Sequence, residues 1–576
     1  SRSVRSGARG EYRIADVPAG PVRLTVQFTG YAPAEIDLQV QAGAPTRRDI
    51  ELFSTAPVAG AARNLATMRV VGVREGDARA LMEQRASMDI TNSLSAESYG
   101  EISEGNPGEF MKFMPGVDTD STGDGTVRHV SLRGLPADYT SITINGISLA
   151  SADANTGAGG SRTFSFEQTS LTGIDSISIF KTTSADKDAN SPAGTIDIRT
   201  KRAFDRSGRD ITAQLSATTH SNQWDSRRRT GPREGGYGSD RFLPSGRIDY
   251  SDVFMDGRLG VVAGVSHSEL YVEQEQITAS RNYNPTPDSP HPLAVTKIVP
   301  QMGTREITRS SGSLNVDFKA TDGLILSLMS SIGRGTILAG STAPELTTYA
   351  RSGVDGNPAT RFTPHEPVSL AARNTLTYKY GTTRNFIPSF EYSNQYFTLD
   401  GNVFYSSSES TYNPNRKGAV HSMVAWPTAT GHASIDRGDE YLEQAWQVQQ
   451  LDGGDWSLPS AYDITGTPTM RLRNSQSADV LKTGGGLNLA FDREFGSTIV
   501  TFKTGAKLEN ARYDFDNPND SWKYRYVGPL STAELLERIQ TTNQHSAADS
   551  GVDYRSVSGA GDMYFPSMFK LYELYQ

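Results

Sequence analysis

The most constraining feature of the sequence is a series of alternating segments, between residues 211 and 511, whose connections are short and long in turn. About nine segments alternate apolar and polar residues, as strands do when their two faces meet different surroundings. They lie roughly at 211–221, 245–255, 258–270, 309–319, 323–333, 384–393, 396–409, 481–492 and 497–511. Short connections join the second to the third, the fourth to the fifth, the sixth to the seventh and the eighth to the ninth segment, and the other connections are long and polar. This order favours an antiparallel barrel of the outer-membrane type over a soluble β-sandwich, which has no reason to gather its long loops at one end.

The two faces of these segments separate well by polarity. In 396–409, apolar or aromatic residues at 397, 399, 403 and 405 alternate with Thr398, Asp400 and Asn402. We expect apolar positions such as Leu324, Leu326 and Leu328 to face lipid. An adhesin built from soluble β-domains, the alternative from another class, would require polar outward faces.

Composition agrees with strands rather than helices as the membrane-crossing elements. Mean hydropathy is −0.47 and 36% of residues are hydrophobic, and no run approaches the roughly 18–20 apolar residues of a spanning helix. The absence of cysteine excludes disulfides, thiolate zinc sites and a cysteine nucleophile. A net charge of −9 argues against nucleic acid as the main partner.

Three further regions precede the barrel pattern. Residues 1–53 contain short alternating strands separated by Pro- and Gly-rich turns, residues 54–73 begin as an Ala-rich linker, and residues 74–205 predict an α+β domain. In that domain Asn106, Pro107 and Glu109 predict a capped helix start, with Phe110, Phe113 and Met114 on its buried face. The fold class is therefore mostly β: a small β-sandwich, an α+β domain, and from 206 to 576 the first part of a large transmembrane barrel.

Catalytic and metal-binding patterns are weak throughout the sequence. The eight histidines are scattered, and no HExxH or GxSxG motif is present. The run from Asp118 to Gly125 resembles a calcium loop, but its fifth position is Thr122 and its twelfth is His129 rather than Glu. We therefore expect no enzyme activity, no metal site and no cofactor.

The α+β domain contains several short motifs: Pro115-Gly116 at the end of the helix, Arg133-Gly134, Asn145-Gly146, Lys181 closing an Ile-Ser-Ile-Phe run, and Gly194 in Ser-Pro-Ala-Gly-Thr-Ile. Together they resemble the plug of a TonB-dependent outer-membrane receptor. Ser178 and Ala193 depart mildly from the family pattern. Residues 1–53 resemble the end of a carboxypeptidase-regulatory-like domain. Four strand-like runs with alternating β-branched residues follow the helix, at 127–134, 140–149, 173–182 and 193–201. Asn-Gly favours the positive φ of a tight hairpin, and we expect Gly134 and Gly146 to permit tight turns between the first two of these runs. We expect Arg133 near the plug–barrel boundary, paired with acidic lumen residues.

The resemblance implies active import of a scarce solute across the outer membrane of a Gram-negative-type bacterium. TonB and its inner-membrane motor proteins would pull on a short extended segment before the plug, which would pair with TonB by strand addition. The candidate for this TonB box is the isolated apolar patch formed by Met68, Arg69, Val70, Val71, Gly72 and Val73. Its alternative is an edge strand of the next domain.

Aromatic residues of the long connection 410–480 are candidates for ligand contact. Exposed aromatic rings suit stacking on sugars, and they equally suit loop packing; the candidates are Tyr412, Trp426, Trp446 and Trp456, together with Tyr441 and Tyr462. The end of the plug pattern also resembles the subgroup associated with plant-glycan uptake, so a carbohydrate is the expected solute. A siderophore, iron or cobalamin receptor and a signal-transducing receptor stay open as alternatives, as does a surface lipoprotein partner beside the outer-membrane lipid.

The chain begins without Met or a signal peptide, and nine strands conflict with the even number found in bacterial barrels. We expect a sequence cut at both ends, carrying the plug and roughly the first half of a barrel.

Overall fold

The computed structural model describes most of the chain from residue 80 onward and parts of the N-terminal region. The described residues are 4, 12–14, 17–27, 34–41, 46, 48, 50, 52, 80–82, 84–85, 87, 89–95, 106–121, 125–155, 163–167, 172–182, 184–185, 187, 191–205, 209–219, 242–286, 291–348, 353–394, 396–412, 422–423, 425–437, 446–465, 469–471, 476–495, 498–516, 523–541, 551–561 and 563–575. The predicted TonB box at 68–73 lies outside them.

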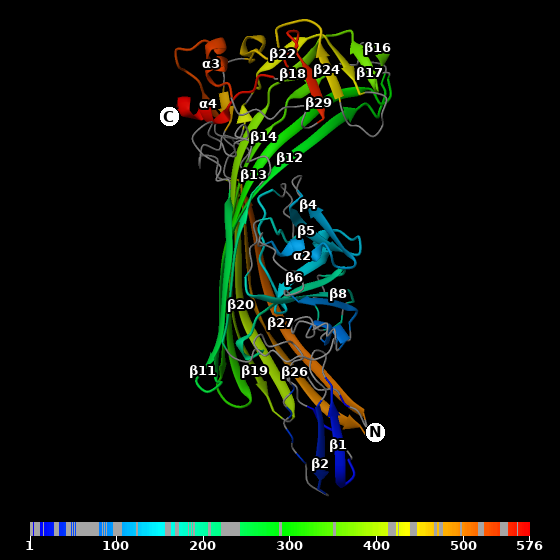
Figure 1. The fold of residues 1–576 in the computed structure, drawn as a ribbon, viewed down its shortest axis with the longest axis vertical. Coiled ribbons are helices and arrows are strands. Elements are labelled where there is room, and N and C mark those ends of the chain that lie inside the picture. The colour runs from blue at the N-terminus through cyan, green and yellow to red at the C-terminus, as the bar shows by residue number, and fades with distance from the viewer. Residues whose placement is uncertain are drawn as a thin grey trace, which may run out of the picture.

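In the N-terminal region the structure describes a two-stranded hairpin. Strands β1 (Gly20–Val26) and β2 (Ala34–Val40) pair antiparallel, with Leu24 opposite Ile36. Both alternate half-buried and exposed positions, which fits strands that cover one side of a small sandwich. The hairpin lies beyond the lower end of the large sheet in Figure 1.

The α+β domain contains a five-stranded and a two-stranded sheet. The first has the order β3 (Thr91–Ser95), β8 (Ile174–Phe180), β9 (Gly194–Thr200), β6 (Thr140–Ile144) and β7 (Ile147–Ser148), and the second pairs β4 (Val117–Ser121) with β5 (Val127–Leu132). Turns η2 (Ala137–Tyr139) and η3 (Ala203–Asp205) complete it. The four strand runs expected after the helix are therefore confirmed. However, the runs at 127–132 and 140–148 lie in different sheets, so the expectation that they neighbour each other is wrong.

The short helix α2 (Pro107–Met111) starts where the sequence predicts, with the Asn106 side chain accepting from the Gly108 N–H. Its capping box does not form, because Glu109 instead accepts from the Val127 N–H at 2.8 Å. This bond ties the helix to β5. Met111 and Met114 are buried, whereas Phe113 is 75% exposed, so its predicted place on the buried face is wrong.

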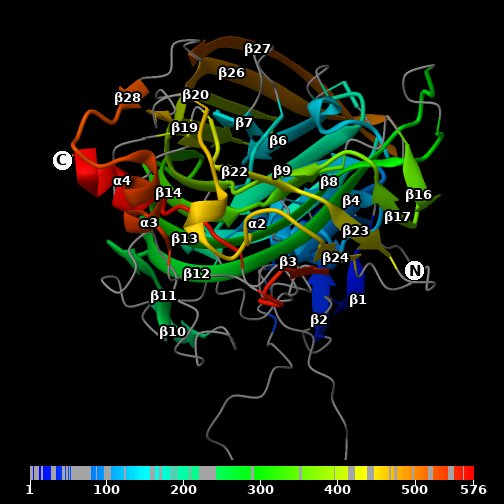
Figure 2. The ribbon, with the colours of Figure 1, turned by 90° about the horizontal axis from the view of Figure 1, so that it is seen from above.

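In the described part of the chain, nine long strands form the continuous path of one antiparallel sheet that curves around the α+β domain (Figures 1 and 2). Tight turns follow the second, fourth and sixth of them, including Met255–Asp256–Gly257, where all three residues have positive φ. The predicted number, order and alternation of the strands are confirmed. In chain order the strands are β10 (Asp210–Thr218), β11 (Leu243–Phe254), β12 (Leu259–Arg281), β13 (Val295–Lys319), β14 (Leu324–Thr342), β19 (Asn374–Ser393), β20 (Phe397–Tyr412), β26 (Ser477–Phe495) and β27 (Thr498–Asp516).

The outward face of this sheet carries large apolar side chains that are exposed in the chain itself. A soluble protein rarely exposes apolar surface over so many strands, whereas a lipid-facing sheet requires it. Leu326 is among these residues, as expected. The others include Ile211, Leu215, Ile248, Val265, Leu314, Ile332, Phe386, Val403, Tyr405, Leu487, Phe502 and Leu508.

Among the described residues, none of the helices has the length and apolar character needed to cross a membrane.

The long connections and the segment that follows β27 fold together into a layer at the end of the sheet opposite the tight turns (Figure 1). We call it the outer layer. Its elements are β15 (Glu345–Thr347), β16 (Val354–Asn357), β17 (Arg361–Pro364), β18 (Val368–Ala371), β21 (Ser422–Met423), β22 (Thr428–Gly431), β23 (Ala433–Asp436), β24 (Trp446–Gln450), η6 (Pro459–Ala461), β25 (Thr469–Arg471), β28 (Lys523–Arg525), α3 (Thr532–Arg538), β29 (Val552–Arg555) and α4 (Met568–Tyr575). Helix α3 begins with a complete capping box between Ser531 and Glu534.

The outer layer has a hydrophobic core of its own. Fully buried residues from five of its segments pack together, among them Phe362, Trp456, Leu535, Tyr554 and Tyr564. A second core fills the α+β domain and continues to Met329, Ile387 and Phe404 on the inner face of the sheet. The domain thus packs through apolar side chains on the inner face of the long-stranded sheet, which we call the wall.

Candidate functional site: the contact between the α+β domain and the wall

The Arg133-Gly134 motif forms the turn that follows β5. Both residues have positive φ, 58° and 71°. The Arg133 guanidinium donates from Nε and Nη2 to the Ala193 carbonyl, at 3.1 and 2.8 Å, and from Nη2 to the Pro192 carbonyl. The expected pairing of Arg133 with acidic lumen residues is wrong: its side chain instead joins two motifs within the domain, because a guanidinium satisfies several carbonyl oxygens at once.

The Asn145-Gly146 motif forms the predicted hairpin turn between β6 and β7, with φ of 49° and 79°. The Asn145 side chain exchanges two hydrogen bonds with Thr200, and the Gly146 N–H donates to Asp197 at 2.7 Å. This turn is thereby fixed to β9, the strand beside it.

Gly194 occupies a site that no larger residue fits. Its φ is 129°, and a Cβ there would lie 2.4 Å from the Phe180 carbonyl oxygen and 2.9 Å from Leu132. Gly116, after Pro115, has a φ of 76°, and a Cβ on it would lie 3.4 Å from Lys181 Nζ. The predicted motifs thus meet in one region of the domain, where they shape its backbone.

A segment of the domain that no motif marked runs along the wall. We call residues 148–155 the wall strip. The N–H groups of Ala150, Ala152 and Ala154 donate to the hydroxyls of Ser406, Ser408 and Ser410 on β20, at 2.8, 3.0 and 3.2 Å.

These three serines, the serine row, follow one another at every second residue of β20, so they share its inner face. The side chains of Ala150 and Ala152 pack on Ala478 and Val480 of the neighbouring strand β26. At the lower end of the strip, Lys482 Nζ donates to Ser148 at 2.6 Å.

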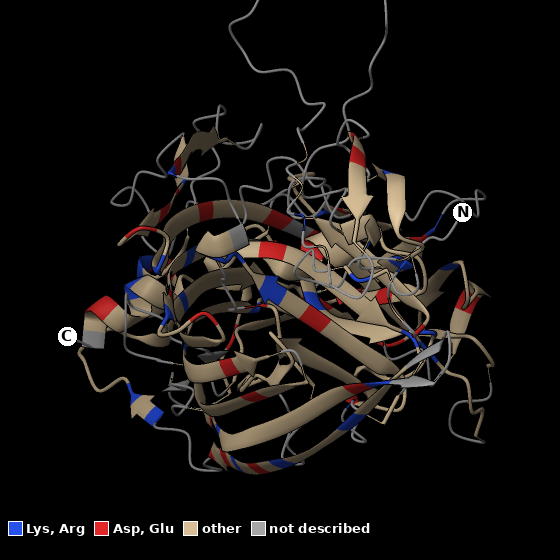
Figure 3. Cartoon of the chain, turned by 90° about the horizontal axis from the view of Figure 1, so that it is seen from below, with Lys and Arg blue, Asp and Glu red and all other residues tan. Residues whose placement is uncertain are grey.

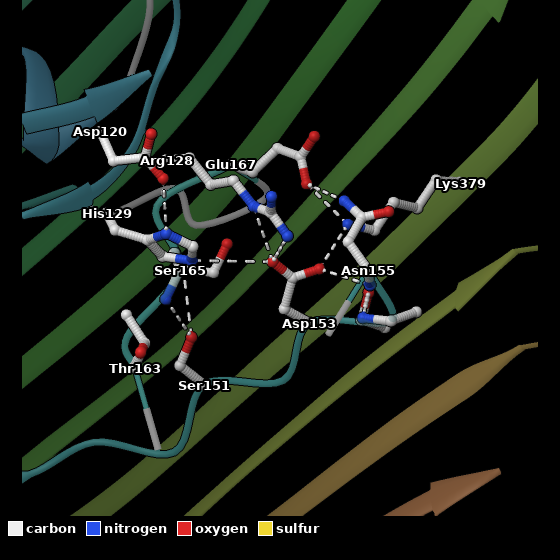
Figure 4. Close-up of polar contacts among 12 residues, drawn as sticks. Asp120, Arg128, His129, Ser151, Asp153, Asn155, Thr163, Ser165, Glu167 and Lys379 are labelled. Carbon is white, nitrogen blue, oxygen red and sulfur yellow. Dashed lines mark hydrogen bonds and ion pairs between the residues drawn. The ribbon is translucent and has the colours of Figure 1, made fainter. Parts of the chain in front are cut away.

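The upper end of the wall strip meets a buried group of charges (Figure 4). Lys379 of β19, 3% exposed, donates to Asp153 at 2.8 Å and to Glu167 at 2.6 Å. Arg128 holds the other oxygen of Asp153 at 2.8 Å, and Arg305 of β13 pairs with Glu167 at 2.7 Å. Three cations and two carboxylates from the domain and the wall are therefore paired in a space largely closed to water.

The charges of this group set the ionisation of its acids. Burial acts to raise the pKa of Asp153, but the positive charges of Lys379 and Arg128 outweigh it and hold that pKa below its usual range. The same balance, with Lys379 and Arg305 as the cations, lowers the pKa of Glu167. Both acids are therefore ionised at neutral pH and bind the wall as carboxylates.

Ion pairs also hold the domain on the side formed by β11–β14. Lys201 pairs with Asp249 at 3.0 Å and Arg202 with Asp317 at 2.9 Å, and Asn315 donates to the Lys201 carbonyl. Basic and acidic residues are interspersed when the molecule is seen from below (Figure 3). No cluster of three or more metal-ligating side chains occurs in the described part of the chain. The contacts described above are those of a folded domain bound to the inner face of the wall.

Comparison with known proteins agrees with this arrangement. A family model described as the TonB-dependent receptor plug domain matches residues 83–195. A second, the carboxypeptidase regulatory-like domain, matches residues 1–53. These two domain matches support a TonB-dependent receptor. Its α+β domain is the plug of an outer-membrane transporter, and the family acts in transport rather than in catalysis.

Solved structures of outer-membrane receptors also resemble the receptor. The transporter YddB from Escherichia coli is 12% identical, with 74% of each chain covered and a TM-score of 0.25. The siderophore receptor PirA from Acinetobacter baumannii is 10% identical, with 77% of this chain and 81% of that chain covered and a TM-score of 0.24. The ferripyoverdine receptor of Pseudomonas aeruginosa is 11% identical, with 77% and 54% covered and a TM-score of 0.34. These scores are too low to carry an argument, and no curated protein sequence matches the receptor.

The candidate ligand aromatics lie in different environments. Trp446 and Trp456 are 3% and 1% exposed and belong to the core of the outer layer, so the expectation that they are exposed is wrong. Trp426 is half-buried, with the Arg373 guanidinium 6.0 Å from its ring centroid. Tyr412 is half-buried at the plug, where its hydroxyl bonds to Asn155.

Lys379 and the serine row were missed by sequence reasoning. The run Ser406–Ser407–Ser408 and Ser410 carries a visible signal, because alternate hydroxyls on a strand must share one face. Lys379 carries none, since its partners Asp153 and Glu167 are 226 and 212 residues away in the chain.

Proposed function

We propose that this TonB-dependent receptor imports a carbohydrate across the outer membrane, with the proton gradient of the inner membrane as the energy source. The observation that carries the proposal is the chemistry of the wall beside the plug. Neutral hydroxyl and amide groups line β19 and β20 there, including Asn385, Ser406, Ser408 and Ser410. Hydroxyls both donate and accept hydrogen bonds, as the hydroxyls of a sugar do.

The charges near this surface support a neutral solute over an anionic one. Lys379 and Arg305 are engaged with plug carboxylates, and a siderophore complex or another anion would have to compete for them. Trp426 is the aromatic candidate that keeps partial exposure at the outer layer, where a ring can stack on a sugar.

We further propose that residues 68–73 are the TonB box and that the division into 1–53, 54–73, 74–205 and 206–576 is the domain organisation. Deletion of 68–73 is expected to abolish uptake and to leave solute binding unchanged, because strand addition to TonB is needed only for energy input. Uptake that persists after this deletion would contradict the assignment.

Binding of solutes to the purified receptor in detergent tests the substrate class. Calorimetry against a panel of plant oligosaccharides and a panel of ferric siderophores is expected to give saturable heat with an oligosaccharide alone. Trp426→Ala is expected to weaken that binding at least several-fold. Exposed Tyr396, at the tight-turn end of the sheet, provides the matched control: Tyr396→Ala should bind as the unchanged receptor does.

Siderophore binding without any response to sugars would overturn the carbohydrate proposal and would favour an iron receptor. Cobalamin is added to the panel, because binding of cobalamin alone would likewise overturn the carbohydrate proposal. A signal-transducing role would appear instead as ligand-dependent gene expression, and a surface lipoprotein partner as a protein that co-purifies with the outer layer.

A further inference from the structure

The serine row is a hydrogen-bonding surface that the plug covers. Ser406, Ser408 and Ser410 are 1%, 6% and 0% exposed, and each accepts a bond from the backbone of the wall strip. Asn385 and Thr383 of β19 bond to two of these hydroxyls from the side. The surface therefore has a partner in this structure, and that partner is plug backbone.

The two sides of the plug are held by bonds of different strength. On the side of β11–β14 the contacts are ion pairs with buried carboxylates, and charge-assisted hydrogen bonds are the stronger kind. Along the serine row the contacts are neutral hydrogen bonds. The part of the strip below Asp153 is therefore the more weakly held contact, and a pull on the plug is expected to part that stretch from β20 before it parts the plug from β11–β14.

The separation has a defined start and end along the strip. At its lower end, the Ala150 N–H donates to the neutral Ser406 hydroxyl, and the Ser148 hydroxyl accepts a single bond from Lys482. Asp153, near its upper end, is held by both Lys379 and Arg128. The strip will therefore leave the wall from its lower end first.

The row left behind matches a polyhydroxylated chain. Its hydroxyls recur at every second residue, about 7 Å apart, and each can donate and accept. Beyond its upper end the Gln476 side-chain oxygen is buried without a hydrogen-bond partner in the described part of the chain. Gln476 is next to Tyr412 in register, since its carbonyl accepts from the Tyr412 N–H.

We propose that Ser406, Ser408 and Ser410 form a binding track for the hydroxyl groups of the solute, uncovered when the wall strip moves away from β20. The track rests on the proposed carbohydrate function for its ligand class. Its position on the β20 side rests on the contacts alone.

Disulfide locking tests the position of the track. The sequence contains no cysteine, so Ala152→Cys/Ser408→Cys introduces a single cysteine pair, at positions joined by the 3.0 Å bond from the Ala152 N–H to the Ser408 hydroxyl. Mass spectrometry under non-reducing conditions establishes that the bridge has formed before uptake is measured. In cells with TonB, oxidation of this variant is expected to stop uptake and reduction to restore it. The control is Gly173→Cys/Ser313→Cys, on the opposite side, where a Cβ on residue 173 would lie 3.8 Å from the Ser313 Cβ, a separation typical of disulfides. Because residue 173 has a φ of 73°, its backbone is strained in both states, and the reduced form of this variant is the reference for the oxidised form. We expect this variant to transport in both states.

Removal of the hydroxyls tests the ligand class. Ser406→Ala/Ser408→Ala/Ser410→Ala is expected to lower the uptake rate of an oligosaccharide at least fivefold and to leave binding at the outer layer unchanged. Ser408→Ala alone should give a smaller loss in the same direction, in case the triple variant folds poorly. The control is Ser266→Ala/Ser311→Ala, which removes two hydroxyls on β12 and β13 that bond to each other at 2.7 Å.

The outcomes separate the track from the proposed function. Normal uptake by the oxidised Ala152→Cys/Ser408→Cys variant, measured with whichever solute the receptor imports, overturns the position of the track. Unchanged oligosaccharide uptake in both serine variants overturns its role as a binding surface. If the receptor binds no oligosaccharide but locking still stops uptake of another solute, the carbohydrate function fails and the site of opening stands.

Discussion

At the scale of single residues, Lys379 is the side chain on which the plug contact most depends. It is the cation shared by Asp153 and Glu167. We predict that Lys379→Met destabilises the plug by about 3–5 kcal/mol at pH 7, because two buried carboxylates lose their common partner. The measurement is the thermal midpoint of plug unfolding in detergent, or its resistance to protease.

The same variant carries a prediction about pH. The pKa values of Asp153 and Glu167 are lowered in the folded receptor, so their contribution to stability is present above their unfolded pKa of about 4 and is lost as pH falls through the folded values. Without Lys379 these pKa values rise. The deficit of Lys379→Met should therefore shrink below about pH 4, and a deficit that does not change with pH would contradict the ion-pair explanation.

Gly194 and Gly134 form a natural pair for testing close packing. Both have positive φ, but a Cβ on Gly194 would lie 2.4 Å from a carbonyl oxygen, whereas a Cβ on Gly134 meets open space. Gly194→Ala should cost more than about 3 kcal/mol, and Gly134→Ala about 1 kcal/mol from backbone strain alone. Equal thermal shifts in the two variants would show that packing at Gly194 is not the limiting factor.

At the scale of elements, the outer layer depends on Trp456. This side chain is 1% exposed among the other core residues of the layer. Trp456→Ala should destabilise the layer by about 3–5 kcal/mol through the lost contacts and the cavity. Limited proteolysis should then cut the outer layer while the strands keep their circular dichroism. Loss of ligand affinity with an intact layer would instead restore Trp456 as a ligand contact.

The elements also show how far sequence reasoning reaches. The long strands were predictable because lipid on one side and polar groups on the other enforce a period of two residues. Trp446 and Trp456 were misjudged because a long polar connection gave no sign that it folds around a core. Lys379 lay beyond reach because a buried ion pair between distant segments leaves no local pattern. The turns at Arg133 and Asn145 were found from their glycines, yet the carbonyl partners of Arg133 depend on the tertiary fold.

At the scale of the whole molecule, the exposed apolar face ties the receptor to the membrane. Val403, on β20, is 59% exposed. We predict that Val403→Arg makes folding into lipid vesicles less favourable by about 2–4 kcal/mol, the cost of a charge near the middle of the bilayer. Val403→Thr is the control and should change it by less than about 1 kcal/mol. Equal folding of all three forms in urea titrations would contradict the lipid-facing assignment.

The length of the strands has a consequence for where the receptor meets its environment. Strand β13 contains 25 residues, which corresponds to about 80 Å at roughly 3.3 Å per residue, and to roughly 55 Å in height at a tilt of about 45°. The apolar band of an outer-membrane barrel is about 25 Å tall. The outer layer therefore stands some tens of ångströms away from the acyl chains, at the level of the sugar chains that coat a Gram-negative cell. A solute arriving from the medium therefore meets the outer layer well before it reaches the level of the acyl chains.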